Sequence, residues 1–227
     1  QSFRSPNLSD LTRLDTARSN EIETPVPGGL DPERFLTSEI GVKVTKPYVY
    51  GGVSYYYTQV KDMIIRTPTG QFIGTDAEVT KKNSGEGYIN GIEFDVGTSL
   101  TSEFSIELKT AWQYGEIETF ASSSATSLQS DYMSRMLPWT SLIKLRYAKA
   151  DKPWWLESLV TIASKQDKLS LRDQGDTQRI PSGGTPGYEV FTLRGGYRVN
   201  ERVNLTVTVE NLTDENYRVH GSGLNEA

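Results

Sequence analysis

Apolar and polar residues alternate along most of this chain with a period of two. The clearest example is the last such segment of the chain. There apolar and polar residues alternate without a break over Val203, Asn204, Leu205, Thr206, Val207, Thr208 and Val209. Successive side chains of a β-strand point to opposite faces, so this pattern predicts a strand with one apolar and one polar face. From Leu36 onward no segment keeps the 3.6-residue period of an amphipathic helix. The sequence therefore predicts an all-β protein.

Eight segments have this alternating or aromatic, β-branched character, and the connections between them are alternately short and long. The segments cover about 36–46, 52–66, 87–98, 103–117, 137–148, 154–166, 188–199 and 203–211, and the long polar stretches, expected to be loops, cover 67–86, 118–135 and 167–187. A β-sandwich has no reason to alternate its connections so regularly. Outer-membrane β-barrels do, because their short turns face the periplasm and their long loops face outside.

The alternation also predicts two faces and two aromatic girdles for such a barrel. The residues expected to face lipid are Ile40, Val42, Val44, Phe94, Val96, Ile106, Leu108, Ile143, Leu145, Leu205 and Val207. The residues expected to line the interior are Lys43, Glu93, Asp95, Glu107, Lys109, Lys144, Arg146, Arg194, Thr206, Thr208 and Glu210. The girdle residues would be Tyr48, Tyr50, Trp154 and Trp155 beside short turns, and Trp112, Tyr114 and Trp139 toward long loops.

Composition narrows the functional classes. The 227 residues are 36% hydrophobic and contain no run of 18 apolar residues, so no transmembrane helix is expected; barrel strands, apolar on one face only, are not excluded by low hydropathy. A net charge of −5 gives no reason to expect nucleic acid as a partner. The absence of cysteine excludes a disulfide scaffold and thiolate metal sites. A soluble β-sandwich that recognises carbohydrate through exposed aromatic residues stays open as the alternative.

Four short motifs resemble those of TonB-dependent outer-membrane receptors. They are the FRSPNL sequence at 3–8, LDPE at 30–33 followed by SEIG at 38–41, the Pro/Gly-rich entry at 180–188, and ENLTDENY at 210–217. In that family the first motif ends a strand, the second opens the next strand, and an extracellular loop joins them. Each motif is short, but their order, spacing and phase agree over the whole chain.

The resemblance implies that residues 1–227 form part of an antiparallel up-and-down transmembrane β-barrel, about eight strands of a barrel of twenty-two. Residues 1–34 would be a strand end and an extracellular loop, 35–211 about eight antiparallel strands, and 212–227 the start of the last extracellular loop. The family's plug domain, energy-coupling box and closing strand have no counterpart here, so the chain is expected to be a portion of a receptor, unable to form a closed pore alone.

The function implied by the resemblance is active uptake of a scarce nutrient, such as a ferric siderophore or cobalamin, across the bacterial outer membrane. The implied partners are outer-membrane lipid, the receptor's own plug, the TonB complex and the small-molecule ligand. A passive porin is less favoured, because the motifs at 3–8 and 30–41 belong to the gated family.

Candidate sites for chemistry are few. No nucleophile motif such as G-x-S-x-G is present, so no enzyme and no catalytic residue is predicted. Residues 7–34 contain no histidine, which disfavours haem, and the lone His220 is expected to be a solvated loop residue. Asp167, Asp173 and Asp176 lack the spacing of a calcium loop and are expected to be solvated. No cofactor or metal site is predicted, and the substrate-binding residues stay unknown; they are expected among the Tyr, Trp and Arg residues of the outer loops.

Overall fold

The computed structural model describes residues 1–18 and 20–225, which form twelve strands and two short helices. The helices are α1 (Leu8–Thr12) and α2 (Leu171–Gly175). The strands are β1 (Ser2–Arg4), β2 (Asp15–Arg18), β3 (Glu21–Glu23), β4 (Glu33–Thr45), β5 (Val49–Ile73), β6 (Asp76–Ser99), β7 (Phe104–Thr119), β8 (Gln129–Tyr132), β9 (Thr140–Ala148), β10 (Trp154–Ala163), β11 (Tyr188–Arg198) and β12 (Asn204–Val209). Among the described residues, no helix is both long and apolar enough to cross a bilayer.

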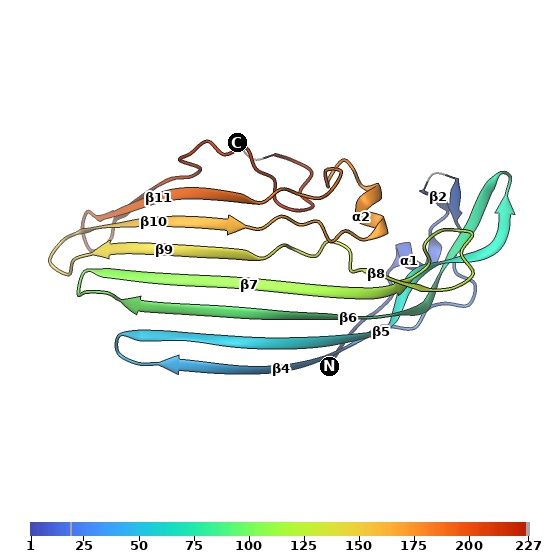
Figure 1. Cartoon of the computed structure of the whole chain (residues 1–227), viewed down its shortest axis with the longest axis horizontal. Helices are drawn as coiled ribbons and strands as arrows, with labels where there is room; N and C mark the ends of the chain where they lie inside the picture. The colour runs from blue at the N-terminus through green and yellow to red at the C-terminus, as the bar shows by residue number, and fades with distance from the viewer. Residues whose placement is uncertain (19, 226–227) are drawn as a thin grey trace. The chain divides into compact units, whose positions relative to one another are not determined.

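All twelve strands belong to one sheet, whose main path runs β1-β4-β5-β6-β7-β9-β10-β11-β12. The eight long strands of this path follow one another in chain order, which is an antiparallel up-and-down topology (Figure 1). They match the eight segments predicted from the alternation, so the predicted fold class is confirmed. Three short strands lie off the path: β2 pairs with β3, β3 pairs in parallel with β6, and β8 pairs with β7.

The chain divides into two compact units, and strands β4, β5, β6 and β7 each contribute residues to both. Unit 1 comprises Gln1–Ser38, Tyr56–Asn90 and Tyr114–Ser134. Unit 2 comprises Glu39–Tyr55, Gly91–Gln113 and the chain from Arg135 onward.

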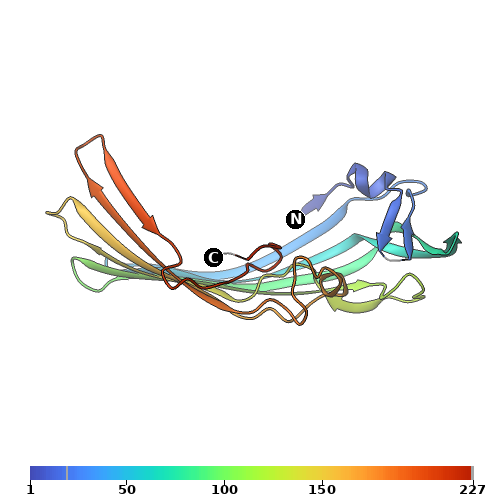
Figure 2. The ribbon, with the colours of Figure 1, turned by 90° about the horizontal axis from the view of Figure 1, so that it is seen from above.

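In unit 2 the four short turns, at 46–48, 100–103, 149–153 and 199–203, lie at the same end of the strands (Figures 1 and 2). The last turn is closed by the Val199 N–H, which donates to the Val203 carbonyl at 3.0 Å. The Asn200 side chain supports it by accepting from the N–H groups of Arg202 and Val203 at 2.9 and 3.0 Å. A short side chain that binds its own backbone is typical of a tight turn, which explains the polar corner in the sequence.

The register of unit 2 places the predicted apolar residues on one face. Ile106, Leu145, Ser158, Leu193 and Val209 stand directly opposite one another across β7, β9, β10, β11 and β12. We call this set the apolar row. Because side chains alternate along each strand, the same face also carries Leu108 and Ile143, which are paired across β7 and β9, and Leu205, which is paired with Tyr197. Leu205 and Val207 are 57% and 67% exposed, so this face has no protein covering it among the described residues.

In unit 1 the expectation of a loop at 67–86 is wrong. β5 continues to Ile73 and β6 begins at Asp76, so that only a tight turn with Gly74 at a positive φ of 66° separates them. The polar residues of this stretch include Thr67, Thr69 and Thr80, and threonine is both polar and favourable in strands. Polarity was therefore mistaken for a loop signal.

The other predicted loops also contain regular structure. Residues 7–34 include α1, β2 and β3; 118–135 include β8; and 167–187 include α2. Helix α1 is capped at its N-terminus by Asn7, whose side chain accepts from the Asp10 N–H at 2.8 Å while the Asp10 carboxylate accepts from the Asn7 N–H, a capping box. Ser19 of the first loop, and Glu226 and Ala227 of the predicted 212–227 loop, lie outside the described residues. The boundaries at 34/35 and 211/212 stay predictions.

Candidate functional site

The face of unit 2 opposite the apolar row carries a continuous polar row. Ser105, Arg146, Glu157, Arg194 and Thr208 stand opposite one another across β7, β9, β10, β11 and β12. The same face holds further residues predicted to line an interior, namely Glu107, Lys109, Lys144 and Thr206. Their common face is confirmed, whereas Lys43 and Glu210 stay predictions.

Glu157 is the centre of the polar row and was missed by the sequence analysis. It is buried, accepts a hydrogen bond from Arg146, and lies 3.8 Å from Nη1 of Arg194. A buried carboxylate between two guanidinium groups is charge-compensated, as burial requires. Its signal in the sequence was its position two residues after Trp155, on the same side of the strand.

Two predicted girdle residues lie on the polar face instead, which corrects their assignment. Trp154 and Trp155 are consecutive residues of one strand and must face opposite sides. Trp155 stands opposite Gly196, and the guanidinium carbon of Arg146 lies 4.4 Å from the centroid of its ring, a cation–π contact. Tyr50 likewise turns to the polar face, where its hydroxyl donates to Glu107 at 2.6 Å. Trp154 lies on the apolar face, where its ring packs on that of Tyr147 with 5.2 Å between the ring centroids.

The two adjacent glycines of β11 give a matched pair of predictions. A Cβ atom at Gly196 would lie 2.2 Å from Cε2 of Trp155, whereas one at Gly195 would meet its nearest atoms at 3.7 Å. We expect Gly196→Ala to push the indole off β11 and destabilise the protein by about 1–3 kcal/mol, and Gly195→Ala to be nearly neutral. Urea unfolding in detergent, followed by tryptophan fluorescence, measures both; equal midpoints for the two variants would refute the packing described.

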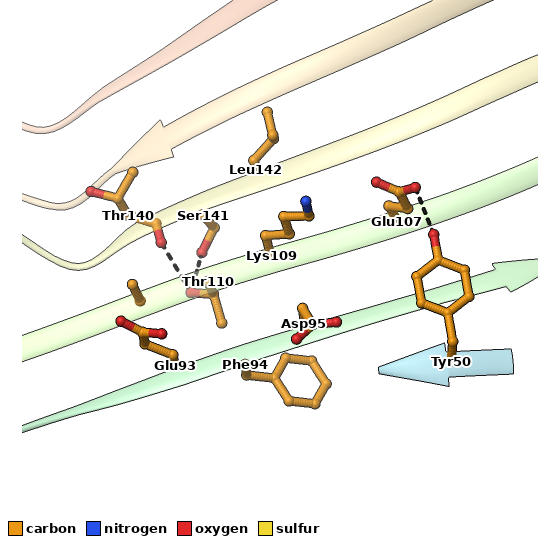
Figure 3. A pocket seen from close by; sticks show the side chains of 11 residues that line it. Tyr50, Glu93, Phe94, Asp95, Glu107, Lys109, Thr110, Thr140, Ser141 and Leu142 are labelled. Carbon is orange, nitrogen blue, oxygen red and sulfur yellow. Dashed lines mark hydrogen bonds between the residues drawn. The ribbon is translucent and has the colours of Figure 1, made fainter. Parts of the chain in front are cut away.

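A cavity of about 590 Å³ opens on the polar face between β5, β6, β7 and β9 (Figure 3). Its lining residues are Tyr50, Glu93, Phe94, Asp95, Glu107, Lys109, Thr110, Ala111, Thr140, Ser141 and Leu142. Lys144 bonds to one oxygen of Glu107 at 2.8 Å while Tyr50 bonds to the other. Glu93 and Asp95 have no hydrogen-bond or ion-pair partner within the described part of the chain. We call this cavity, with its two free carboxylates, the acidic cavity.

The acidic cavity suits a polar or cationic group better than a metal. Nowhere in residues 1–18 and 20–225 do three or more His, Cys, Asp or Glu side chains gather in a way that would hold a metal ion. The hydroxyl of Thr110 is engaged with the Thr140 carbonyl and with Ser141 at 3.1 and 2.7 Å (Figure 3). The wall offers hydrogen-bonding groups and negative charge.

In unit 1 an ion-pair cluster joins the two N-terminal motifs. Arg4 of the first motif binds Glu33 of the second, and its Nη1 lies 2.9 Å from Asp10. Lys81 of β6 binds Asp10 at 2.9 Å and lies 3.4 Å from Glu23. These ion pairs connect the segment between the two motifs to strands β4 and β6.

The ion-pair cluster lowers the pKa of Asp10. Burial alone would raise the pKa of Asp10, but hydrogen bonds from Lys81, the Asn7 N–H and Arg4 lower it to about 2. Because the pKa in the folded state lies below the ordinary value, the stabilisation is present above about pH 4 and is lost as the pH falls toward 2.

The four candidate residues of the C-terminal half are placed differently from expectation. His220 is buried, and its Nδ1 lies 2.9 Å from Oγ1 of Thr185, so it is not solvated. Asp173 is 1% exposed and bonds to the backbone N–H of Arg135. Asp176 is half-buried and pairs with Arg135 and Arg179. Only Asp167 is an exposed loop residue as predicted, 3.5 Å from Lys165. Tertiary contacts between loops, which no local pattern reveals, account for the difference.

Comparison with protein families finds one match, to the family described as "TonB dependent receptor-like, beta-barrel", over residues 1–212. No curated protein matches the sequence. The match covers all eight long strands and both N-terminal motifs.

Solved structures with the same fold include three transport proteins. The copper transporter OprC matches over 100% of this chain and 33% of its own, with 19% identity and a TM-score of 0.70. A mutant of the ferric enterobactin receptor PfeA from Pseudomonas aeruginosa, in complex with enterobactin, matches over 99% and 35%, with 18% identity and a TM-score of 0.72. The iron transporter FrpB from Neisseria meningitidis matches over 88% and 30%, with 16% identity and a TM-score of 0.65. The chain thus spans about a third of the length of these proteins.

Proposed function

We propose that this chain, which belongs to the TonB-dependent receptor β-barrel family, is part of the wall of an outer-membrane receptor that takes up a scarce nutrient with energy supplied through TonB. The nutrient would be a ferric siderophore or cobalamin. The family is made up of transport receptors, so no enzymatic role is proposed.

The observation that carries the proposal is the opposition of the apolar and polar rows. Ile106, Leu145, Leu193 and Val209 share one face, and Arg146, Glu157 and Arg194 share the other. A sheet covered by lipid on one side and by a polar interior on the other needs this arrangement. A soluble β-sandwich would bury its apolar face against a second sheet, and the described strands form a single sheet. The carbohydrate-binding alternative therefore has no support.

The polar face would contact the plug domain of the same receptor. The acidic cavity, with Glu93 and Asp95 unpaired, suits basic or amide side chains of such a domain. TonB would engage a region beyond this chain, and the ligand would be held by outer loops together with the plug. The net charge of −5 agrees with the absence of nucleic acid among the proposed partners.

Substrate uptake in the bacterium that produces the protein tests the proposal. The gene for this protein and, separately, the gene for TonB are deleted, and uptake of radiolabelled ferric siderophores, cobalamin and copper is measured; copper is included because one of the structural neighbours is a copper transporter. We expect both deletions to abolish uptake of the same substrate. Uptake lost with the receptor but retained without TonB would indicate a passive pore, and undiminished uptake of every substrate would refute the proposal.

A further inference from the structure

Three loops of unit 2 lie together around the only histidine of the chain. They are the segment before β9, which contains Arg135, the segment between β10 and β11, which contains α2, and the segment after β12. Residues 217–225 of the last segment contact both others, because Gly221 lies beside Arg135 and Gly223 lies beside Arg179. The ring of Tyr217 also packs on Tyr188, the first residue of β11, with 4.6 Å between ring centroids. We call residues 217–225 the C-terminal strap.

Asp173 of α2 binds Arg135, and these two residues lie beside the C-terminal strap. This carboxylate is 1% exposed and accepts from the Arg135 N–H at 3.0 Å, while the guanidinium Nε of Arg135 lies 3.5 Å away. Arg135 has a positive φ of 65°, a conformation that a bulky residue adopts only where contacts hold it. Its Nη1 is buried without a hydrogen-bond partner and lies under Gly221 of the strap.

His220 fastens the strap to this surface. Its side chain is buried, and Nδ1 pairs with the hydroxyl of Thr185, which is 2% exposed. The charged groups that face it are Asp173 of α2 and Arg135 of the loop before β9. The next charges outward are Asp176 and Arg179, and the carboxylate of Asp176 forms ion pairs with both Arg179 and Arg135. The imidazole is therefore largely shielded from water, and it lies near a guanidinium group whose Nη1 is buried without a hydrogen-bond acceptor.

We propose that His220 is a proton-operated latch, which holds the C-terminal strap against the loops that carry Arg135 and Thr185 at neutral pH and releases it in acid. This inference does not depend on the proposed function. Release would uncover the buried side of Arg135 and separate Tyr217 from Tyr188.

The direction of the effect follows from the surroundings of the imidazole. Burial lowers the pKa of His220 and Arg135 lowers it further, while Asp173 opposes them with a smaller effect than burial. Because the free imidazole binds protons more tightly than the latched one, the latch is intact above about pH 6.5 and weakens as the pH falls below it. Each unit of difference between the two pKa values raises the open fraction about tenfold.

Two measurements on the full chain in detergent micelles test the latch. His220 gives the only imidazole signal in a ¹³C-histidine NMR spectrum, so its titration is read directly. The chain has no cysteine, so a nitroxide attached through Leu224→Cys, at a side chain 69% exposed, reports on the strap alone. We expect an imidazole midpoint below about 6.5, and a mobile nitroxide fraction that rises as the pH falls from 7.5 to 5.0. A midpoint at or above the ordinary value, or a nitroxide equally mobile at both pH values, would overturn the proposal.

Two further substitutions separate the latch from a general effect of acid. In His220→Asn the side chain keeps a group that can pair with Thr185 but takes up no proton, so the nitroxide should stay immobile down to pH 5.0. In Thr185→Val the partner hydroxyl is lost at constant shape, so the strap should be more mobile at both pH values. Acid release that persists in His220→Asn would assign the proton to Asp173 or Asp176 and contradict the latch.

Discussion

Replacing Glu23 with glutamine should open the β2–β3 hairpin and destabilise it by about 2–4 kcal/mol. Glu23 is 1% exposed, bonds to Nε of Arg66 at 3.1 Å and lies 3.4 Å from Nζ of Lys81, with Arg13 a third cation at 3.9 Å. Removing one charge of a buried cluster leaves its partners uncompensated. For a fully buried pair this lowers the free energy of unfolding by about 3–5 kcal/mol. The partial exposure of Arg66 reduces this value.

Hydrogen exchange of the β3 amides measures this effect, because a short hairpin can open without unfolding the sheet. Asp15→Asn is the matched control: Asp15 belongs to the same hairpin, but its carboxylate is exposed and lies 4.0 Å from Arg13. Exchange in β3 should accelerate strongly in Glu23→Gln and hardly at all in Asp15→Asn. Equal protection of β3 in both variants would show that the cluster does not hold the hairpin.

Leu205→Arg should destabilise the protein in a lipid bilayer by about 2–4 kcal/mol if the residue lies near the middle of the membrane, whereas Thr206→Arg should cost much less. Leu205 stands on the apolar face opposite Tyr197, and Thr206 stands on the polar face opposite Gly196. An arginine placed among lipid chains loses its hydration, while one on the polar face stays solvated or finds a carboxylate.

Urea unfolding in phospholipid vesicles compares the two variants on one strand. A smaller loss of stability for Leu205→Arg than for Thr206→Arg would reverse the assignment of the faces. The same experiment in detergent provides a control for folding, since local rearrangement of detergent should reduce the difference.

The sequence predicted the eight strands and their faces because a period of two is a local property that burial on one side imposes. The rows through Leu145 and Arg146 followed once the strands paired in order, and short turns such as that at Asn200 fixed this order. The motif resemblance identified the family for the same reason, since FRSPNL and ENLTDENY lie at strand ends where local geometry restricts the residues.

What the sequence could not reveal depends on partners distant in the chain. Nothing near Glu33 indicates that Arg4 binds it, and nothing near His220 indicates that Thr185 and Arg135 surround it. The long β5–β6 hairpin was missed because threonine-rich strands and polar loops have similar compositions. Trp155 was assigned to a girdle because it is close to a turn. Consecutive residues of a strand point to opposite faces, so with Trp154 on the apolar face Trp155 must lie on the polar face.

Substrate contacts were not predicted and are not proposed at the level of residues. The acidic cavity around Tyr50 and Glu107 was partly foreseen, because Glu93, Asp95, Glu107 and Lys109 were assigned to one face. Its shape depends on Tyr50 turning inward, which the alternation of β5 did not make plain.

Cysteine labelling in the outer membrane tests most directly which face meets lipid. Because the chain has no cysteine, Leu205→Cys and Thr206→Cys each introduce a single reactive thiol on neighbouring residues. A maleimide dissolved in the lipid phase should label Leu205→Cys and leave Thr206→Cys unmodified, since the two side chains point to opposite faces of β12. Labelling of Thr206→Cys with Leu205→Cys unmodified would contradict the account.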